Sequence, residues 1–219
     1  MKQKVFKHLV ILCLAAFSAC NRNTPGSASG YGPQEGDLLF VVAASGDFSE
    51  AVVEATAQGD SLRFSHVAIV AVEDGTPYVV EASSRHGVTR TGWRDFLDKA
   101  QQGGGKPAVV VKRVADKGFP LSEAVARARS HIGEAYDWSF LPDNGRMYCS
   151  ELVYESYRKT DGSPLFTARP MNFRAADGSM PAFWTELFER LGEPIPEGVP
   201  GTNPNDMAKD PALREVARF

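Results

Sequence analysis

Cys149 lies in the segment Tyr148-Cys149-Ser150-Glu151, where the sequence pattern changes from a loop to a helix. The backbone N–H groups and the dipole at a helix N-terminus favour an anion, so a cysteine there is stabilised as the nucleophilic thiolate. The other two cysteines, Cys13 and Cys20, belong to a leader segment, so we expect Cys149 to be the free thiol of the mature protein. It is either a nucleophile or a small buried hydrophobe.

A cysteine nucleophile needs a base, and the base needs a partner that orients it. Three histidines follow the leader: His66, His86 and His131. His66 opens the otherwise apolar run 65–72, where a polar residue is either an odd surface residue or a placed functional group. His86 follows a loop and fits a solvated surface position, and His131 fits a charge near a helix C-terminus. His66 is therefore the candidate base.

Asp74-Gly75 is a strong signal for a two-residue β-hairpin turn. A turn centred there places Ala68 opposite Glu81 and His66 opposite Ser83. Because residues two apart on a strand share a face, His66 and Glu81 become diagonal neighbours ~7–8 Å apart, within reach of long side chains. Glu81 would then accept a hydrogen bond from one imidazole nitrogen while the other faces the thiol. The alternative for Glu81 is an edge charge that discourages aggregation.

Apolar runs, helical spacing and turn residues predict the elements that position these side chains. The expected strands are Leu38–Ala43, Ser65–Val72, Tyr78–Ala82, Gly87–Thr91, Ala108–Arg113 and a segment near Val216. The expected helices are Phe48–Gln58, Trp93–Lys99, Leu121–Ile132 with Ser122 as N-cap, Cys149–Lys159, Met180–Leu191 and a short helix after Asn203. This mixed order argues for an α+β fold with helices packed on a mostly antiparallel sheet.

The first twenty residues have the build of a secretory signal peptide. A basic start precedes a short apolar run, residues 9–17, and small residues then lead to Cys20. The ending resembles a bacterial lipoprotein signal, which implies cleavage before Cys20 and acylation of Cys20 itself. Phe17 stands where such signals usually have Leu. The alternative is an ordinary secretory leader with Cys20 left free.

We expect three parts: a lipoprotein signal peptide (1–19), a Gly/Pro-rich flexible tether (20–34) and one globular domain (35–219). The net charge is −3 and no basic stripe is present, so nucleic acid is not an expected partner. The sequence has no zinc-ligand spacing, Gly-rich phosphate loop or Ser-elbow pattern, so we expect neither a metal nor a cofactor. The expected location is the bacterial cell envelope, where the lipid would anchor the chain to a membrane, facing the periplasm or at the outer membrane.

The order of the motifs resembles the YiiX-like cysteine peptidases, a circularly permuted branch of the NlpC-type papain-like enzymes. The segments that carry the resemblance are, in order, Gly36-Asp37-Leu38-Leu39-Phe40, Ser65-His66-Val67-Ala68-Ile69, Val80-Glu81-Ala82, Tyr136-Asp137 and Tyr148-Cys149-Ser150-Glu151-Leu152-Val153. Unpermuted members have Cys first, then His, then a polar residue. Here His and Glu precede Cys, as in the permuted branch. The similarity spans roughly residues 35–159 and is looser beyond them.

The resemblance implies a permuted papain-like domain with Cys149 as nucleophile, His66 as general base and acid, and Glu81 as the orienting third residue. A thiolate–imidazolium pair would attack an amide carbonyl and form a thioester that water resolves. The backbone N–H of Cys149 would stabilise the oxyanion. The broader family implies amide or peptide bonds of cell-wall fragments as substrates. A small peptide or an amino-acid conjugate fits equally, because no wall-binding domain is appended.

Other residues near the motifs are candidates for the walls of the site. Tyr148, Tyr136 and Ser150 are the expected substrate-binding residues, with packing in the core as the alternative for Tyr148. Asp137 is a weaker candidate for the same cleft. Asp37 is expected to fix the turn before the first strand.

Two other functions stay open on the sequence. Lecithin:retinol acyltransferase-like proteins transfer acyl groups through a cysteine thioester, and a lipid anchor would place this domain beside acyl chains. Those proteins typically carry a histidine as third residue and an Asn-Cys-Glu-His motif, whereas this chain has Glu81 and Tyr148-Cys149-Ser150-Glu151. The second alternative is a non-catalytic ligand-binding lipoprotein in which the Cys/His/Glu set is idle.

Overall fold

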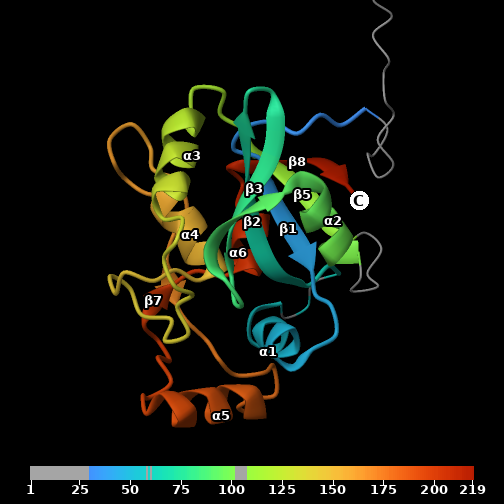
Figure 1. Cartoon of the computed structure of the whole chain (residues 1–219). Helices are drawn as coiled ribbons and strands as arrows, with labels where there is room; N and C mark the ends of the chain where they lie inside the picture. The colour runs from blue at the N-terminus through green and yellow to red at the C-terminus, as the bar shows by residue number, and fades with distance from the viewer. Residues whose placement is uncertain (1–29, 58, 60, 102–107) are drawn as a thin grey trace, which may run out of the picture.

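The computed structural model describes residues 30–57, 59, 61–101 and 108–219. Its centre is a six-stranded antiparallel sheet with the strand order β4-β3-β2-β1-β5-β8 (Figure 1). The strands of this sheet are β1 (Leu38–Val42), β2 (Phe64–Glu73), β3 (Thr76–Ser83), β4 (Gly87–Gly92), β5 (Val109–Val114) and β8 (Leu213–Arg218). The helices are α1 (Asp47–Thr56), α2 (Trp93–Gln101), α3 (Leu121–Ser130), α4 (Cys149–Ser156), α5 (Ala182–Leu191) and α6 (Pro204–Lys209). The predicted α+β class is confirmed.

Helices cover both faces of the sheet, and its central strands are accordingly apolar runs instead of alternating ones. One face, which carries Leu38 and Ile69, packs against α3 and α4. The opposite face, which carries Leu39 and Val70, packs against Phe96 of α2. Figure 1 shows α3 and α4 on one side of the strands and α2 on the other. The site residues are thus carried by a sheet that is held from both sides.

The hairpin of β2 and β3 has the predicted turn and register. Asp74 and Gly75 both have positive φ, 49° and 74°, as a two-residue hairpin turn of the type I′ kind requires. Ile69 pairs with Val80 and the ladder continues to the turn. Beyond Ile69 the two strands separate, because β2 continues along β1 alone and β3 along β4 alone. The sheet therefore opens at the end where the chemistry-bearing residues lie.

Helix α3 begins two residues earlier than a Ser122 N-cap would allow, because an N-cap at Ser122 would put the first helical residue at position 123. The carbonyl of Pro120 accepts a hydrogen bond from the Ala124 N–H at 3.0 Å, so the helix starts at Leu121 and Ser122 lies inside its first turn. The prediction of Ser122 as N-cap is wrong. The proline before the helix supplies the first acceptor, and a proline also fits this boundary because it lacks the N–H that a helix interior needs.

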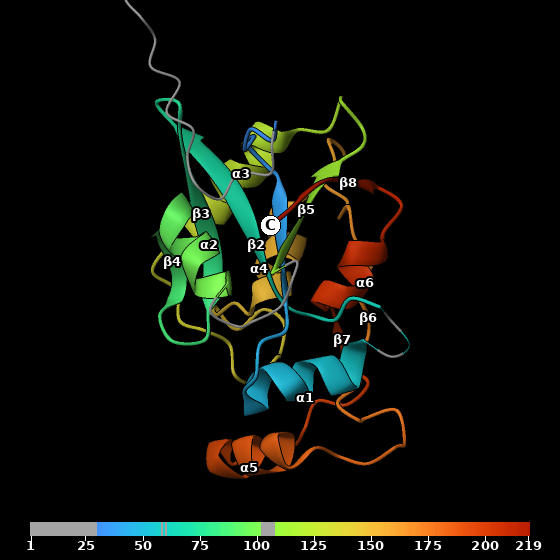
Figure 2. The same ribbon diagram turned by 90° about the vertical axis from the view of Figure 1, so that its right-hand side faces the viewer.

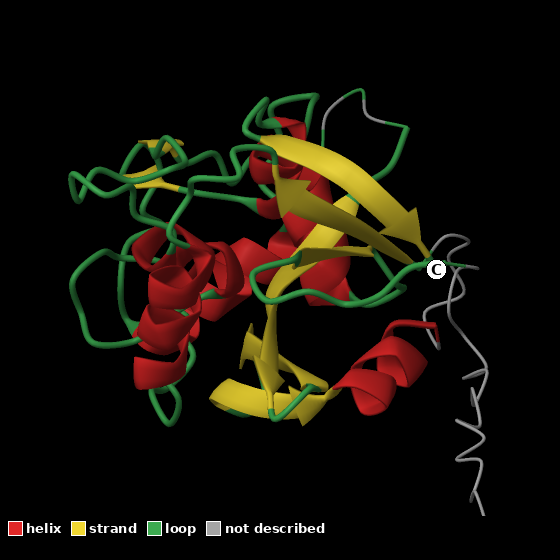
Figure 3. Ribbon diagram, turned by 90° about the horizontal axis from the view of Figure 1, so that it is seen from above, coloured by secondary structure: helices red, strands yellow, loops and turns green. Residues whose placement is uncertain are grey.

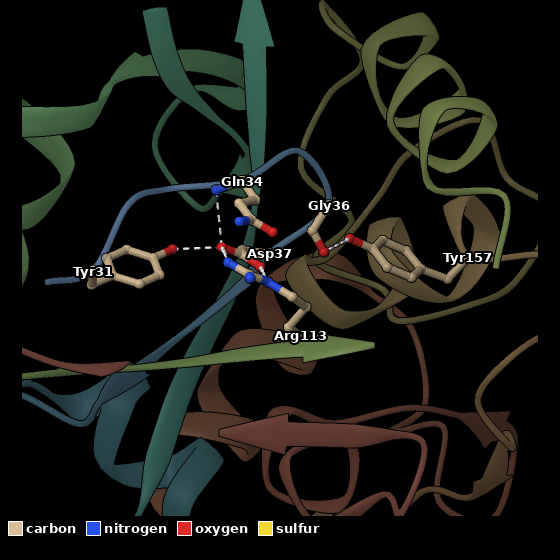
Figure 4. A network of polar contacts seen from close by, with 6 residues as sticks. All are labelled: Tyr31, Gln34, Gly36, Asp37, Arg113 and Tyr157. Atoms are coloured by element: carbon tan, nitrogen blue, oxygen red, sulfur yellow. Dashed lines mark hydrogen bonds and ion pairs between the residues drawn. The ribbon is translucent and has the colours of Figure 1, made fainter. Parts of the chain in front are cut away.

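Helix α4 ends at Ser156, three residues before the expected Lys159. Tyr157 leaves the helical conformation, and its hydroxyl donates a hydrogen bond to the carbonyl of Gly36 at 2.9 Å (Figure 4). Gly36 has φ 78°, and a Cβ there would lie 2.5 Å from the Leu121 side chain. The end of α4 is thus fixed to the chain that enters β1, at a position that only glycine fills without strain.

Asp37 holds the turn before β1, as expected. Its buried carboxylate accepts two hydrogen bonds from the Arg113 guanidinium, at 2.5 and 2.7 Å, and one from the Tyr31 hydroxyl at 2.6 Å (Figure 4). The backbone N–H of Gln34 donates a fourth at 3.0 Å. A fully buried carboxylate is tolerable only when it is paired and hydrogen-bonded in this way. This cluster fixes the start of the sheet at the end away from the hairpin opening.

The chain after α4 returns to the sheet through α5, α6 and two short strands. Figure 2 shows α5 lying against α1 at one end of the molecule. The strands β6 (Arg169–Pro170) and β7 (Pro200–Gly201) pair with each other, separate from the main sheet (Figure 3). These strands were not predicted, because two residues are too short to show a period. Helix α6 starts as predicted, with the Asn203 side chain accepting the Asp206 N–H at 2.8 Å.

Within the described ranges, no helix combines the length and the apolar character needed to cross a bilayer. The expected signal peptide, Cys20 and most of the tether fall in residues 1–29 and lie outside the described residues. So does most of the Gly-rich loop before β5, residues 102–107.

Candidate active site

Cys149 is the first residue of α4 and is 8% exposed. At this position its backbone N–H has no acceptor within the helix. The preceding N–H, of Tyr148, donates to the Glu151 carboxylate at 3.3 Å, which closes half of a capping box. Burial raises the pKa of Glu151 to about 8, against the opposing effect of the Tyr148 N–H. Local sequence thus fixes the helix start, and the helix start places the thiol beside free N–H groups.

His66 and Glu81 meet across the opening between β2 and β3. The His66 Nε2 atom lies 2.9 Å from Glu81 Oε2, and the other carboxylate oxygen accepts the Thr91 hydroxyl at 2.6 Å. Thr91 lies on β4, where the neighbouring Thr89 pairs with Glu81. The sequence predicted the contact between His66 and Glu81, but it gave no sign that Thr91 would hold the second oxygen. Threonine is common in strands, so Thr91 does not stand out in the sequence. Its role depends on how β4 is aligned with β3.

Cys149 and Glu81 contact the same imidazole. His66 uses Nε2 for Glu81, which leaves Nδ1 as the nitrogen that can face Cys149. Burial lowers the pKa of His66, but the hydrogen bonds and charges of Cys149 and Glu81 outweigh it and raise that pKa to about 10. Burial likewise raises the pKa of Glu81, and the bonds from His66 and Thr91 outweigh it, so the pKa of Glu81 lies below its usual value. The arrangement therefore holds an imidazolium between a carboxylate and a thiol at neutral pH.

Cys149 opens onto a cleft with a volume of about 570 Å³. Its wall includes Tyr148, Ser150 and Tyr136, the three residues predicted to bind substrate. The remaining wall comes mainly from α1, α5, α6 and the segments around β6 and β7, with one residue of β2 and one of the loop before α4. Its residues are Phe48, Val52, Ala55, Thr56, Ser65, Phe140, Arg169, Pro170, Met171, Asn172, Phe173, Trp184, Gly201, Thr202, Asn203, Pro204, Asp206 and Lys209. Most of this second set was not predicted, since it comes from segments far from the motifs.

Thr202 holds both neighbours of the nucleophile through its backbone. The Ser150 hydroxyl donates to the Thr202 carbonyl at 2.9 Å, and the Thr202 N–H donates to the Tyr148 hydroxyl at 3.2 Å. The adjacent Gly201 leaves room for this contact, since a Cβ there would lie 3.0 Å from the Tyr148 hydroxyl. Burial raises the pKa of Tyr148. Tyr148 thus packs in the core and also lines the cleft, so both of the alternatives that the sequence left open for it apply.

Asn205 positions the strand that carries His66. Its side-chain amide both donates to the Phe64 carbonyl and accepts from the Phe64 N–H, each at 2.8 Å. It also donates to the Thr56 hydroxyl at 2.8 Å. Asn205 is 1% exposed, and no local pattern marks it, because its partners lie more than a hundred residues away in sequence.

Three residues that the sequence analysis considered, His86, His131 and Asp137, lie outside the site. His131 pairs with Glu134 at 3.0 Å, and His86 is exposed in the turn that follows β3. Asp137 does not line the cleft, so that weaker prediction is wrong. Its buried carboxylate accepts the backbone N–H groups of Ser139 and Leu141, both at 2.9 Å, and so folds the loop before Cys149.

An antiparallel sheet bearing a histidine, set against the N-terminus of a helix that begins with a cysteine, defines the papain-like class of proteins. The family model described as "Permuted papain-like amidase enzyme, YaeF/YiiX, C92 family" matches residues 32–217. The chain therefore belongs to the permuted papain-like amidase family, a family of peptidases and amidases, as its motif order predicted.

Two comparisons agree with this assignment. The uncharacterized protein YiiX of Escherichia coli (strain K12) is 28% identical over 189 residues, which cover 85% of this chain and 87% of that protein. A crystal structure of YiiX from Escherichia coli O157:H7 superimposes with a TM-score of 0.69 at 27% identity, covering 86% of this chain and 99% of that one. The sequence match agrees with the family, and the structural match shows the same fold over most of the chain.

YiiX from Escherichia coli O157:H7 is described as a metalloprotein. In the part of this chain that the structure describes, no three His, Cys, Asp or Glu side chains gather in a way that could hold a metal ion. The Glu81 carboxylate already contacts the His66 Nε2 atom with one oxygen and accepts the Thr91 hydroxyl with the other, so both oxygens are engaged within the protein. The described residues therefore do not fit a metal site.

Proposed function

We propose that this chain is a cysteine hydrolase that cleaves an amide or peptide bond through Cys149, His66 and Glu81. The observation that carries the proposal is the single imidazole held between the thiol and a carboxylate, with its pKa raised to about 10. A raised pKa keeps the ring protonated beside the sulfur, and an imidazolium stabilises a thiolate. Thr91 and Glu81 then hold the ring in one orientation.

The reaction follows from this arrangement in two halves. The Cys149 thiolate attacks the carbonyl carbon, and the backbone N–H of Cys149 faces the oxyanion that forms. His66 donates its proton to the leaving amine as the C–N bond breaks, which leaves a thioester on Cys149. Neutral His66 then takes a proton from water, the hydroxide attacks the thioester, and the carboxylic acid departs as the thiolate and imidazolium are restored.

A set of four variants tests these roles with a fluorogenic panel of short peptide amides. Cys149→Ala and His66→Ala should abolish turnover while leaving the thermal midpoint near that of the wild type. His86→Ala and His131→Ala are the controls of matched size, and they should retain wild-type rates. Turnover that survives in Cys149→Ala would remove the nucleophile assignment, whereas equal loss in all four variants would indicate damage to the fold.

We propose that the enzyme works in the bacterial cell envelope on a small peptide or amino-acid conjugate, such as a fragment of cell-wall peptide. The support is the leader pattern before Cys20 and a cleft volume in the range of sites for small ligands. Cys20→Ser in the host should move the protein from the membrane fraction to the soluble fraction. Continued membrane association would contradict acylation of Cys20.

Acyl transfer to or from a lipid is the second candidate function. The observation that favours it is a cluster of aromatic rings in the cleft wall, in which Phe140, Phe173 and Trp184 contact one another. In that case Cys149 would be acylated by a phospholipid, and short peptide amides would not react. The third candidate, an idle ligand-binding site, predicts that Cys149 is alkylated at the rate of an ordinary thiol.

A further inference from the structure

Five aromatic residues of the cleft wall contact one another, and we call this part of the cleft the aromatic lobe: Phe48, Tyr136, Phe140, Phe173 and Trp184. These rings pack against one another around Trp184. Its ring centroid lies 5.0 Å from that of Phe173, 5.6 Å from that of Phe140 and 6.1 Å from that of Phe48, all nearly perpendicular. A second tryptophan, Trp138, packs on the outside of the same cluster against Phe48 and Tyr136.

Trp184 has a polar atom that the protein does not satisfy. The side chain is 2% exposed, and its indole Nε1 is buried without a hydrogen-bond partner among the described residues. Buried donors nearly always have an acceptor, so a donor that lacks one in a residue of the cleft wall needs an explanation. Thr202, in the wall of the same cleft, has a buried hydroxyl in the same condition.

The aromatic lobe is continuous with the nucleophile. The ring of Tyr148, which adjoins Cys149, lies 5.3 Å from the ring of Phe140, and Phe140 contacts Trp184. His66 does not line this cleft. Because His66 must protonate the leaving amine, the amine half of the substrate stays beside His66. The half that remains on Cys149 as the thioester is therefore the one that can extend into the lobe.

We propose that the aromatic lobe binds an N-acylated aminoacyl group with an apolar side chain, so that the substrate is a peptide or acyl-amino-acid amide. The apolar side chain packs among the rings. Because the Trp184 Nε1 atom is buried in the free protein, the rings must part to admit the ligand, and a backbone carbonyl of the same group then accepts the Trp184 N–H. A fatty acyl chain would fill the same space but would leave that N–H without an acceptor. The inference rests on the proposed function, because the roles of Cys149 and His66 decide which half of the substrate enters the lobe. It favours peptide-like acyl groups over fatty acyl groups.

Two ligands that differ in one group test the inference without turnover. N-acetyl-phenylalanine methylamide has both the ring and the additional carbonyl, whereas 3-phenylpropanoic methylamide has the ring alone. Binding of each to the full chain carrying Cys149→Ala is measured by titration calorimetry. The first should bind about tenfold more tightly, the ratio that one hydrogen bond to a buried donor worth about 1.4 kcal/mol produces. Octanoic methylamide, the lipid-like probe, should bind no better than the second.

Replacing the indole then assigns the effect to Trp184. In Cys149→Ala with Trp184→Phe, the ratio between the two ligands should fall to near one, because the ring remains and the N–H is lost. Trp138→Phe, which alters a tryptophan of the same cluster outside the cleft wall, should keep the tenfold ratio. Equal binding of the two ligands with Trp184 intact would overturn the inference, and so would tighter binding of the octanoic amide.

These outcomes separate the inference from the proposed function. A tenfold ratio that depends on Trp184, together with no hydrolysis of the corresponding anilides by the wild type, would support the lobe and contradict the hydrolase assignment. Hydrolysis by the wild type together with equal binding of the two ligands would support the hydrolase assignment and contradict the lobe. The thermal midpoint of each variant is measured alongside. The comparison of the two ligands on the Cys149→Ala protein keeps Trp184, so it holds even if Trp184→Phe fails to fold.

Discussion

The pH dependence of Cys149 alkylation in wild type and His66→Ala tests the ion pair directly. The folded-state pKa of His66 is raised from 6.5 to about 10, so the imidazolium is fully formed below pH 6.5 and is lost only as the pH rises through about 10. Across pH 6 to 9 the charge beside the sulfur is therefore constant, and the alkylation rate of the wild type should be nearly flat. His66→Ala removes that charge, and labelling should then rise through the ordinary thiol range, near pH 8.5.

The expected difference in alkylation rate between wild type and His66→Ala follows from the fraction of Cys149 that is ionised. An ordinary thiol with a pKa of about 8.5 is only ~0.3% ionised at pH 6. The proposed ion pair would keep the sulfur ionised at that pH, which alone would give a ratio of ~300. The intrinsic reactivity of such a stabilised thiolate is lower, which reduces the ratio to roughly 10–100. We therefore expect His66→Ala to label about 10- to 100-fold more slowly at pH 6 and at nearly the wild-type rate above pH 9.

The assay is pseudo-first-order labelling with iodoacetamide, followed by mass spectrometry of the peptide that contains Cys149. Following that peptide avoids any contribution from Cys13 or Cys20 in the full chain. His131→Ala is the matched control, because His131 pairs with Glu134 instead of the thiol. Parallel curves in wild type and His66→Ala, both rising near pH 8.5, would refute the ion pair and favour an idle site.

Three further predictions follow from contacts in the structure. Glu81→Gln replaces a charged acceptor of His66 with a neutral one, a loss of ~1–2 kcal/mol, so kcat/KM on an amide substrate should fall about 5- to 30-fold, less than in His66→Ala; an unchanged value would exclude an orienting role. Asp37→Asn breaks the buried pair with Arg113, and urea unfolding should show a loss of about 3–5 kcal/mol, with the pH profile of Cys149 alkylation preserved in the folded protein. Exhaustive treatment with a chelator should leave both alkylation and turnover unchanged, and a loss that zinc restores would contradict the absence of a metal role.

The sequence was sufficient for the part of the site that depends on local geometry. A two-residue turn at Asp74-Gly75 fixes the register of the hairpin, and the register alone makes His66 and Glu81 diagonal neighbours. A helix start at Cys149 likewise follows from the residues around it. The order of these motifs then indicated the permuted papain-like fold that the family match confirms. The end of α4 was misplaced because a distant contact intervened, where Tyr157 turns toward Gly36.

The cleft could not be predicted in the same way. Asn205 contacts Phe64 across 141 residues, and Ser150 contacts Thr202 across 52, so neither contact leaves a periodic or motif signal. The aromatic residues of α1 and α5 read as ordinary core positions, because a ring that packs on a neighbour and a ring that packs on a substrate have the same local pattern. Trp184 is distinguished only by the missing acceptor of its indole N–H.

Substitutions in the catalytic residues and substitutions in the cleft wall should have different effects, because the two sets come from different elements. The ion pair is built on β2, β3 and α4, whereas much of the wall that faces a substrate comes from α1, α5 and the chain around β7. Side chains such as Trp184 contact the cleft without contacting His66 or Glu81, so their substitution should alter which acyl group is bound and leave the alkylation profile of Cys149 intact. Thr202 is the exception, since it lines the cleft and its backbone also holds both Tyr148 and Ser150. Substitutions there that move the backbone should affect the nucleophile and the specificity together.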